Sequence, residues 1–205
     1  MRKFIIICIL ISLSVILQAR SVSSSDEGRL TFGAEWSFIS SFHSRVHHNF
    51  FSEEGYRVDL IKRNMGYENN GELELHCGYD INNDWNISLH TGFVGIYNIG
   101  NAIPVSIRLT RLFKEDRVGD RWLCYIDTGT GVCLKENPQM IAVGKIGGGY
   151  RMSLSRTTKL DFLLACRTSL THPQVVFDGY VVPFEKTNRN NAFITALSLG
   201  ISLTF

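Results

Sequence analysis

Apolar and polar residues alternate along most of the chain beyond Gly28, and no convincing stretch shows apolar residues at helical spacing. The segment 193–205 shows this alternation most clearly. Its odd positions are apolar, broken only by Thr195, and its even positions beyond residue 194 are small or polar, namely Ala196, Ser198, Gly200, Ser202 and Thr204. Because successive side chains of a strand point to opposite faces, this pattern predicts a β-strand with one apolar and one polar face.

Seven further segments alternate in the same way, at about 30–38, 72–79, 85–93, 103–110, 121–134, 140–155 and 160–169. Short connections are expected at 80–84, 114–120 and 156–158, and longer ones lie between them. The longest are two predicted loops at about 39–70 and 171–190, with shorter ones near 98–101 and 135–139. Short turns at one end and longer loops at the other predict an all-β fold, an eight-stranded antiparallel up-and-down transmembrane β-barrel over residues 29–205.

Alternation alone does not separate a membrane barrel from a soluble lipocalin-like barrel, which turns its apolar face inward. The polar face favours the membrane barrel. A narrow eight-stranded interior holds side chains but no bulk water, so charges buried there must pair. The polar face offers four acids, four bases and two histidines for such a lumen network: Glu35, Glu74, His76, His90, Arg108, Asp127, Lys145, Arg151, Asp161 and Arg167.

Aromatic residues mark the short-turn end of nearly every predicted strand, as expected for a girdle at a bilayer interface. These residues are Phe32, Tyr79, Trp85, Phe113, Trp122, Phe162 and Phe205. Candidates for the opposite girdle are Trp36, Phe38, Tyr97 and Phe193. Both sets lie on the apolar face, which we therefore expect to contact lipid.

With this pattern, the chain from Leu30 to Phe205 resembles the small eight-stranded outer-membrane barrels of the OmpX and OmpA transmembrane-domain kind. The resemblance covers the alternation over nearly this whole span, but residue identity only over the final segment, 198–205. It implies an integral outer-membrane protein of a diderm bacterium, surrounded by outer-membrane lipid. The final segment resembles the insertion signal that the barrel assembly machinery recognises, which implies that role for Leu197, Ile201, Leu203 and Phe205.

The first residues have the three-part layout of a secretory signal peptide. Arg2 and Lys3 form a positive start, an apolar run follows to Leu17, and Ala19 provides a small-residue exit. The apolar run is shorter than the roughly twenty residues that a spanning helix needs. We predict a cleavable signal peptide at 1–19, followed by a short periplasmic segment at 20–28.

Composition excludes two broad classes. The chain of 205 residues is 44% hydrophobic, which is too apolar for a disordered protein. Its formal charge of +2 is too small for a dedicated nucleic-acid binder, so we expect no nucleic-acid partner.

Four cysteines, Cys77, Cys124, Cys133 and Cys166, follow the predicted signal peptide. Their spacing fits no zinc ribbon, which needs close pairs of cysteines. Three of them fall on the apolar face of a predicted strand and behave there as small hydrophobic residues. A bridge between Cys124 and Cys133 is the alternative.

The longest predicted loop contains a histidine cluster, His43, His47 and His48, and an exposed aromatic candidate, Tyr56. These four are the candidate binding residues. The spacing of His43 and His47 would suit a zinc site on one helical face, but it resembles no closed structural zinc site. We therefore expect an exposed polar loop and no metal.

The function is the least determined property. Eight strands enclose too small a circle for a large open pore. Some eight-stranded barrels modify lipid A, and the deacylase family among them carries a His-x-Ser-Asn pattern, which no histidine of this chain matches. We predict a non-enzymatic protein without cofactors, serving envelope structure or surface binding through long extracellular loops. The alternatives are a lipid-A-modifying enzyme, with His90, Glu74 and Ser88 as its constellation, and a periplasmic lipocalin-like carrier.

Overall fold

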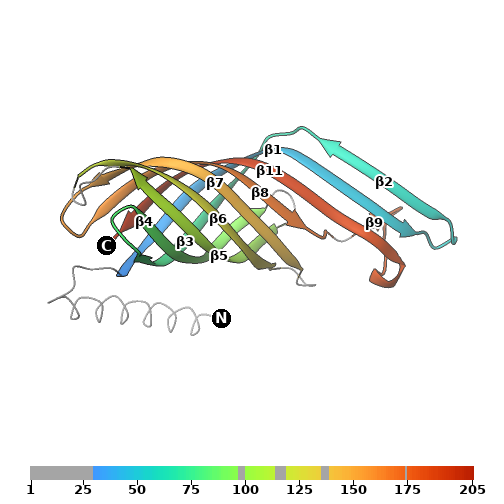
Figure 1. Ribbon diagram of the computed structural model, residues 1–205. Helices are drawn as coiled ribbons and strands as arrows, with labels where there is room; N and C mark the ends of the chain where they lie inside the picture. Colours follow the sequence, from blue (N-terminus) through green and yellow to red (C-terminus); the bar gives the residue numbers. More distant parts are fainter. Residues whose placement is uncertain (1–29, 97–99, 114–118, 135–138, 174) are drawn as a thin grey trace, which may run out of the picture.

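The strands close into a barrel around a common axis (Figure 1). The computed structural model describes residues 30–96, 100–113, 119–134, 139–173 and 175–205. Neighbouring strands pair antiparallel, and the last strand pairs back onto the first, which confirms the predicted eight-stranded barrel. Its strands are β1(Leu30–Phe51), β3(Glu68–Asp80), β4(Trp85–Ile96), β5(Gly100–Phe113), β6(Arg121–Cys133), β7(Met140–Ser153), β8(Lys159–Thr171) and β11(Thr187–Thr204).

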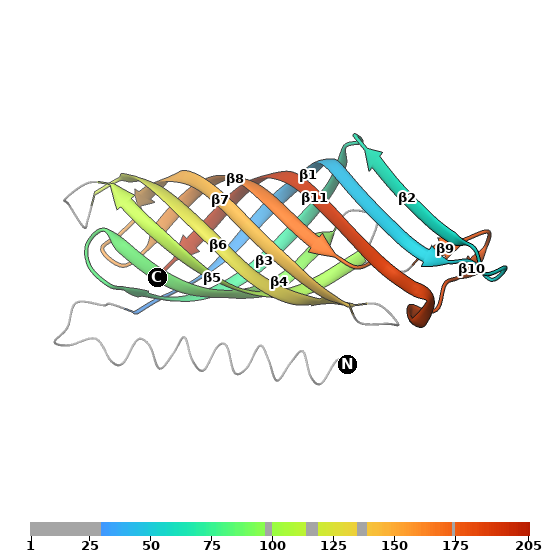
Figure 2. The ribbon, with the colours of Figure 1, turned by 45° about the vertical axis from the view of Figure 1, so that its right-hand side comes forward.

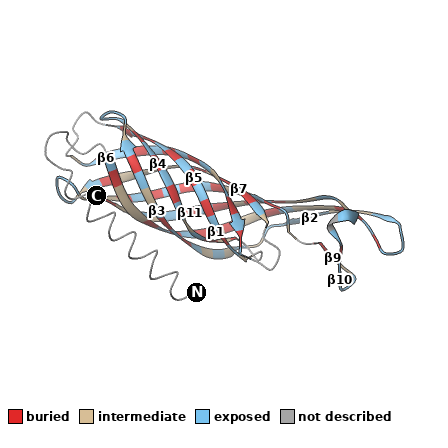
Figure 3. Cartoon of the chain, turned by 90° about the horizontal axis from the view of Figure 1, so that it is seen from below, coloured by how far each residue is buried: buried red, intermediate tan, exposed pale blue. Residues whose placement is uncertain are grey.

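The two faces of the barrel have the polarity of a membrane protein. Buried and exposed residues alternate along the strands (Figure 3). In β5, for example, Val105 and Ile107 are exposed, whereas the residues that follow them, Ser106 and Arg108, are buried. A closed sheet that exposes apolar side chains is stable where lipid replaces water, because every backbone group of the ladder is paired. The lipocalin-like alternative is wrong, since it requires these apolar side chains inside.

The aromatic girdle at the short-turn end is exposed as expected, with Phe113, Trp122 and Phe205 among its outward-facing members. The opposite girdle is only partly as expected. Phe193 faces outward near the far end of the barrel, but Phe38 pairs with Leu199, which lies midway between Phe193 and Phe205. Phe38 therefore lies within the apolar band rather than at its edge.

A three-stranded extension replaces the predicted loop at 39–70, which is a correction to the sequence analysis. β1 is 22 residues long in total. Its second half pairs with β2(Arg57–Asn64) on one side and with β11 on the other. The extension projects beyond the barrel (Figure 1, Figure 2). A register irregularity between Ser41 and His43 and the many polar residues beyond it obscure the alternation. Pairing between strands, rather than burial in lipid, forms this segment.

The second predicted loop, 171–190, is also partly structured. It contains β9(Val176–Phe177), β10(Tyr180–Val181) and a short 3-10 turn, η2(Phe184–Lys186), and β11 begins as early as Thr187. Asp178 and Gly179 join β9 to β10 with φ angles of 48° and 81°. Positive φ at both central residues is the geometry of a type I′ hairpin, which favours Asp-Gly at this position.

The small hairpin covers one face of the extension. Phe50, Val175 and Val182 form a buried apolar cluster there, and Val58 and Leu60 of β2 pack against it. The extension therefore has a hydrophobic core separate from the barrel.

The exposure of each cysteine depends on the strand face on which it lies. Cys77, Cys124 and Cys166 are exposed free thiols on the outward face, as expected. Cys133 faces inward and is buried, so the alternative bridge to Cys124 is not formed. The predicted signal peptide at 1–19, the segment 20–28 and Tyr97 lie outside the described residues. Among the described residues, no helix has the length and apolar character to cross a membrane.

Because the outward face is apolar, a charged side chain in the middle of the lipid-facing part of β11 should strongly destabilise the barrel. Leu199 is 57% exposed and lies halfway between Phe193 and Phe205. Leu199→Lys should lower the free energy of unfolding in vesicles by about 2–4 kcal/mol, because the ammonium would enter the bilayer midplane. As a control, Ile61→Lys places the same charge on exposed β2 and should change it by less than about 0.5 kcal/mol. Equal losses in denaturant titrations would contradict the lipid-facing assignment.

Candidate functional site

The middle of the lumen holds a network of buried charges. Glu35 on β1 and Glu74 on β3 lie directly opposite each other, a like-charge pair that needs cations. Arg108 on β5 donates to both carboxylate oxygens of Glu35, and its Nε lies 3.1 Å from Asp127 on β6. The Arg108 guanidinium also lies 4.4 Å from the centre of the Tyr125 ring. Arg108 thus joins three strands across the lumen.

Lys145 supplies the second cation of the network. It donates to Glu72 at 2.8 Å and to Glu74 at 3.0 Å. Arg167 on β8 donates to the other oxygen of Glu72. Because both cations contact Glu72, this carboxylate links β7 and β8 to β3.

The structure brings together six of the ten predicted lumen residues in this network, namely Glu35, Glu74, Arg108, Asp127, Lys145 and Arg167. Arg151 and Asp161 form a separate bidentate pair, with both bonds at 2.7 Å. The sequence analysis missed Glu72, although it lies two residues from Glu74 and therefore on the same face. It also missed Arg121, which is buried on the inward face of β6.

Within the described residues, the buried side chains comprise equal numbers of acids and bases. The acids are Glu35, Glu72, Glu74, Asp127 and Asp161, and the bases are Arg108, Arg121, Lys145, Arg151 and Arg167. Such neutrality is expected where water cannot solvate an unpaired charge. The lumen charges therefore compensate one another.

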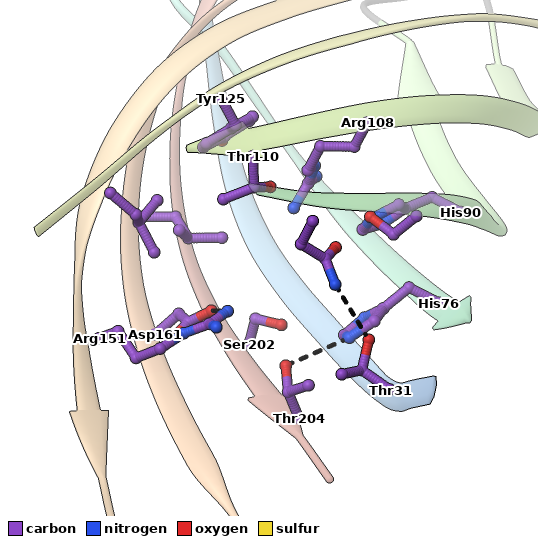
Figure 4. Close-up of a pocket in the computed structure, with 14 residues that line it drawn as sticks. Thr31, His76, His90, Arg108, Thr110, Tyr125, Arg151, Asp161, Ser202 and Thr204 are labelled. Atoms are coloured by element: carbon purple, nitrogen blue, oxygen red, sulfur yellow. Dashed lines mark hydrogen bonds and ion pairs between the residues drawn. The ribbon is translucent and has the colours of Figure 1, made fainter. Parts of the chain in front are cut away.

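The two predicted lumen histidines stack on each other with ring centres 5.0 Å apart. His76 lies 3.2 Å from Thr204, and Figure 4 shows it directed toward this residue. His90 contacts Ser88 at 3.0 Å through Nε2, and its Nδ1 lies 3.5 Å from Glu74. Ser88, His90 and Glu74 thus have the order of a nucleophile, base and orienting acid.

The surroundings of Ser88 do not suit catalysis. The adjoining cavity has a volume of only about 30 Å³. This volume accommodates about two water-sized spheres, whereas substrate pockets measure hundreds of Å³. Glu74 is also engaged by Lys145. Ser88, His90 and Glu74 therefore belong to the polar packing of the lumen rather than to a catalytic site.

The same carboxylates enter the one potential metal-ligand group in the described part of the chain. Glu35, Glu74 and His90 offer atoms within 4.8 Å of one another. Arg108 and Lys145 already neutralise both carboxylates. A metal ion would have to displace these cations, so the group functions as an ion-pair network.

Apolar side chains fill the lumen on both sides of the charges, a feature that the sequence analysis did not predict. Toward the extension, the buried cluster comprises Ile39, Val94, Ile96, Ala102, Cys133, Ile141, Val143, Ile194 and Ala196. Toward the short turns, it comprises Leu112, Leu123, Tyr125, Leu163 and Ala165. Apolar packing and neutral ion pairs together close the lumen.

The predicted loop histidines lie on strand β1, not in a loop, which is a further correction. His43 and His47 share one face, but four strand residues span about 13 Å, too far for a shared zinc ion. His47 instead donates to Asp59 at 2.8 Å, and His48 lies 3.1 Å from Asn190. Tyr56 is exposed in the turn between β1 and β2.

Local contacts set the ionisation of two residues in the extension. The hydrogen bond from His47 lowers the pKa of Asp59, and a bond from Asn49 acts in the same direction. Partial burial lowers the pKa of His48. Asp59 therefore stays negative and is committed to contacts within the extension.

Comparison with known proteins yields similarity in structure alone. No protein-family model and no curated sequence matches the chain. Neisserial surface protein A has a TM-score of 0.48 at 11% identity, with 88% of this chain and all of that one covered. The OprF N-terminal barrel of Pseudomonas aeruginosa has a TM-score of 0.45 at 13% identity, covering 84% and 99%. Ail of Yersinia pestis has a TM-score of 0.37 at 14% identity, with 87% of this chain and all of that one covered.

The class of this protein rests on its own geometry. The sheet is closed, an apolar band of side chains faces outward, and acidic and basic side chains are buried inside in equal numbers among the described residues. These properties define a small eight-stranded membrane β-barrel of the outer-membrane type.

The lumen network makes Glu72 a sensitive position. Glu72→Ala should lower the free energy of unfolding by about 3–5 kcal/mol, because Lys145 and Arg167 each lose a buried partner. The measurement is a denaturant titration in vesicles, followed by the mobility difference between unheated and boiled samples. Glu53→Ala, in the exposed turn after β1, should stay within about 0.5 kcal/mol of wild type. A Glu72 variant as stable as the Glu53 variant would contradict the network.

Proposed function

We propose that the protein is a non-enzymatic outer-membrane surface protein, with the barrel as its anchor and the three-stranded extension as its binding element. One contrast carries this proposal. The lumen is packed with side chains around a cavity of about 30 Å³, whereas the extension projects from the barrel on a hydrophobic core of its own. The interior is thus too small for a substrate. A partner would instead find an accessible surface on the extension.

Continuous strands and a packed apolar core make the extension an ordered structure. Two of its three strands, β1 and β11, run without interruption from the barrel into the extension. Phe50 at its core is 0% exposed, and its ring contacts Phe177 edge to face with centroids 5.2 Å apart. A surface that is already ordered loses little conformational entropy when it binds a partner, which favours a binding role.

We also propose the route by which the protein reaches the membrane. Residues 1–19 would direct export from the cytoplasm of a diderm bacterium and be cleaved off, leaving 20–28 in the periplasm. The three-part layout of 1–19 supports this step. Leu197, Ile201, Leu203 and Phe205 would form the insertion signal for the barrel assembly machinery. Three of these residues, Leu197, Ile201 and Phe205, are exposed on the outward side of the C-terminal segment, where a partner could contact them.

The proposal requires the extension to face the cell exterior. Tyr56→Cys should react with a membrane-impermeant maleimide in intact cells, because Tyr56 is exposed in the β1–β2 turn. Asn82→Cys, in the short turn between β3 and β4, should react only after the outer membrane is permeabilised. Wild type is the control, since its three exposed cysteines face lipid. Labelling of the Asn82 variant alone in intact cells would overturn this orientation.

The enzymatic alternative centres on the contact between His90 and Ser88. His90→Ala should leave the lipid A mass profile of cells unchanged, because no lipid-sized space adjoins Ser88 in the lumen. The profile is measured by mass spectrometry in a deletion strain complemented with either form. A modification present with wild type and lost with the variant would show that the protein is an enzyme.

A further inference from the structure

Two arginines on the outward face of the extension form an uncompensated pair. Arg45 on β1 and Arg63 on β2 lie directly opposite each other, and both are exposed. Like charges in this position destabilise a sheet. Among the described residues, neither guanidinium has an acidic ion-pair partner. Asp59, the acid on the same face of β2, is held by His47 and Asn49 instead.

The lumen shows how this chain compensates a buried like-charge pair. Glu35 and Glu74 also lie directly opposite each other, and Arg108 on β5 and Lys145 on β7 neutralise them across the lumen. No such counter-charge from the described residues reaches Arg45 and Arg63. The exposed pair is therefore open to a negative charge from outside the chain.

The arginine pair lies where the membrane surface is expected. Arg45 is paired in register with Phe193 on β11, which is 38% exposed on the lipid-facing side. From Phe193 to Phe205 the chain advances 205 − 193 = 12 residues. At about 3.4 Å per residue and a tilt near 45°, this spans roughly 29 Å. Since the apolar band of such barrels is about 25 Å tall, the pair lies just beyond it, among the headgroups.

We propose that Arg45 and Arg63 bind the phosphate monoester of an anionic outer-leaflet lipid headgroup, with Phe193 beside its acyl chains. Two guanidinium groups match the geometry and charge of a phosphate, to which each can donate two hydrogen bonds. The proposal rests on the proposed function only in placing the extension at the outer surface. It gives the binding element a ligand class, an anionic lipid with a phosphate monoester, which zwitterionic phosphatidylcholine lacks.

The test uses the full mature chain refolded in vesicles of phosphatidylcholine, with or without phosphatidic acid. Phosphatidic acid should raise the urea midpoint of wild type, because a ligand that binds only the folded state stabilises it. The Arg45→Ala/Arg63→Ala variant should lose this increment, and the phosphatidic acid content needed for half of the effect should rise at least about tenfold. In phosphatidylcholine alone the double variant should be as stable as wild type or more stable, because the like-charge pair is gone.

Lys62→Ala is the matched control. Lys62 adjoins Arg63 on β2 and is exposed, but it lies on the opposite face, in register with Val46. This variant should retain the full increment. Arg63→Ala alone should lose much of it, and the gel shift on boiling verifies that each variant is folded.

Three outcomes would overturn the proposal. Equal increments in wild type and the double variant, or an equal loss in the Lys62 variant, would reduce the effect to general surface charge. Stabilisation by inorganic phosphate in phosphatidylcholine vesicles, equal to that by phosphatidic acid, would assign the pair to a free anion rather than a lipid. The vesicle result does not depend on cell topology, so it stands apart from the maleimide labelling that tests the proposed function.

Discussion

Pairing between β1 and β11 closes the sheet, and the other features of the molecule depend on this closure. Lipid offers no hydrogen-bond partners, so an open edge would leave a row of backbone groups unsatisfied. Once the sheet is closed, alternate side chains must point either into lipid or into a narrow lumen. The apolar set takes the first position and the charged set the second, which makes ion pairing inside the barrel a requirement rather than an option.

The lumen meets that requirement mainly through two cations that each contact several carboxylates. Arg108 contacts Glu35 and Asp127, and Lys145 contacts Glu72 and Glu74, so strands distant in sequence are tied across the interior. Apolar clusters close the space on either side. This filling explains why a triad-like arrangement at His90 has no room for a substrate.

The extension follows different rules because it lies beyond the apolar band. Its covered face packs on Phe50, and its open face carries Arg45 and Arg63 without a counter-charge from the described residues. The apolar side chains of the covered face are buried against other residues of the same chain. The open face is complementary to an anion outside the chain, and its height along β11 places that anion at the membrane surface.

The barrel could be predicted from the amino-acid pattern, because strands that alternate in polarity can span lipid only as a closed barrel with the apolar face outward. The charged lumen residues could be predicted as well, since each lies on the polar face of a strand. Their partners, the role of Glu72 and the apolar layers at Ile39 and Leu163 emerge only in the folded chain, because they depend on neighbours far apart in sequence. The same holds for the strand that carries His43, His47 and His48, because pairing with β2 and β11, and not a local pattern, extends β1 beyond the membrane.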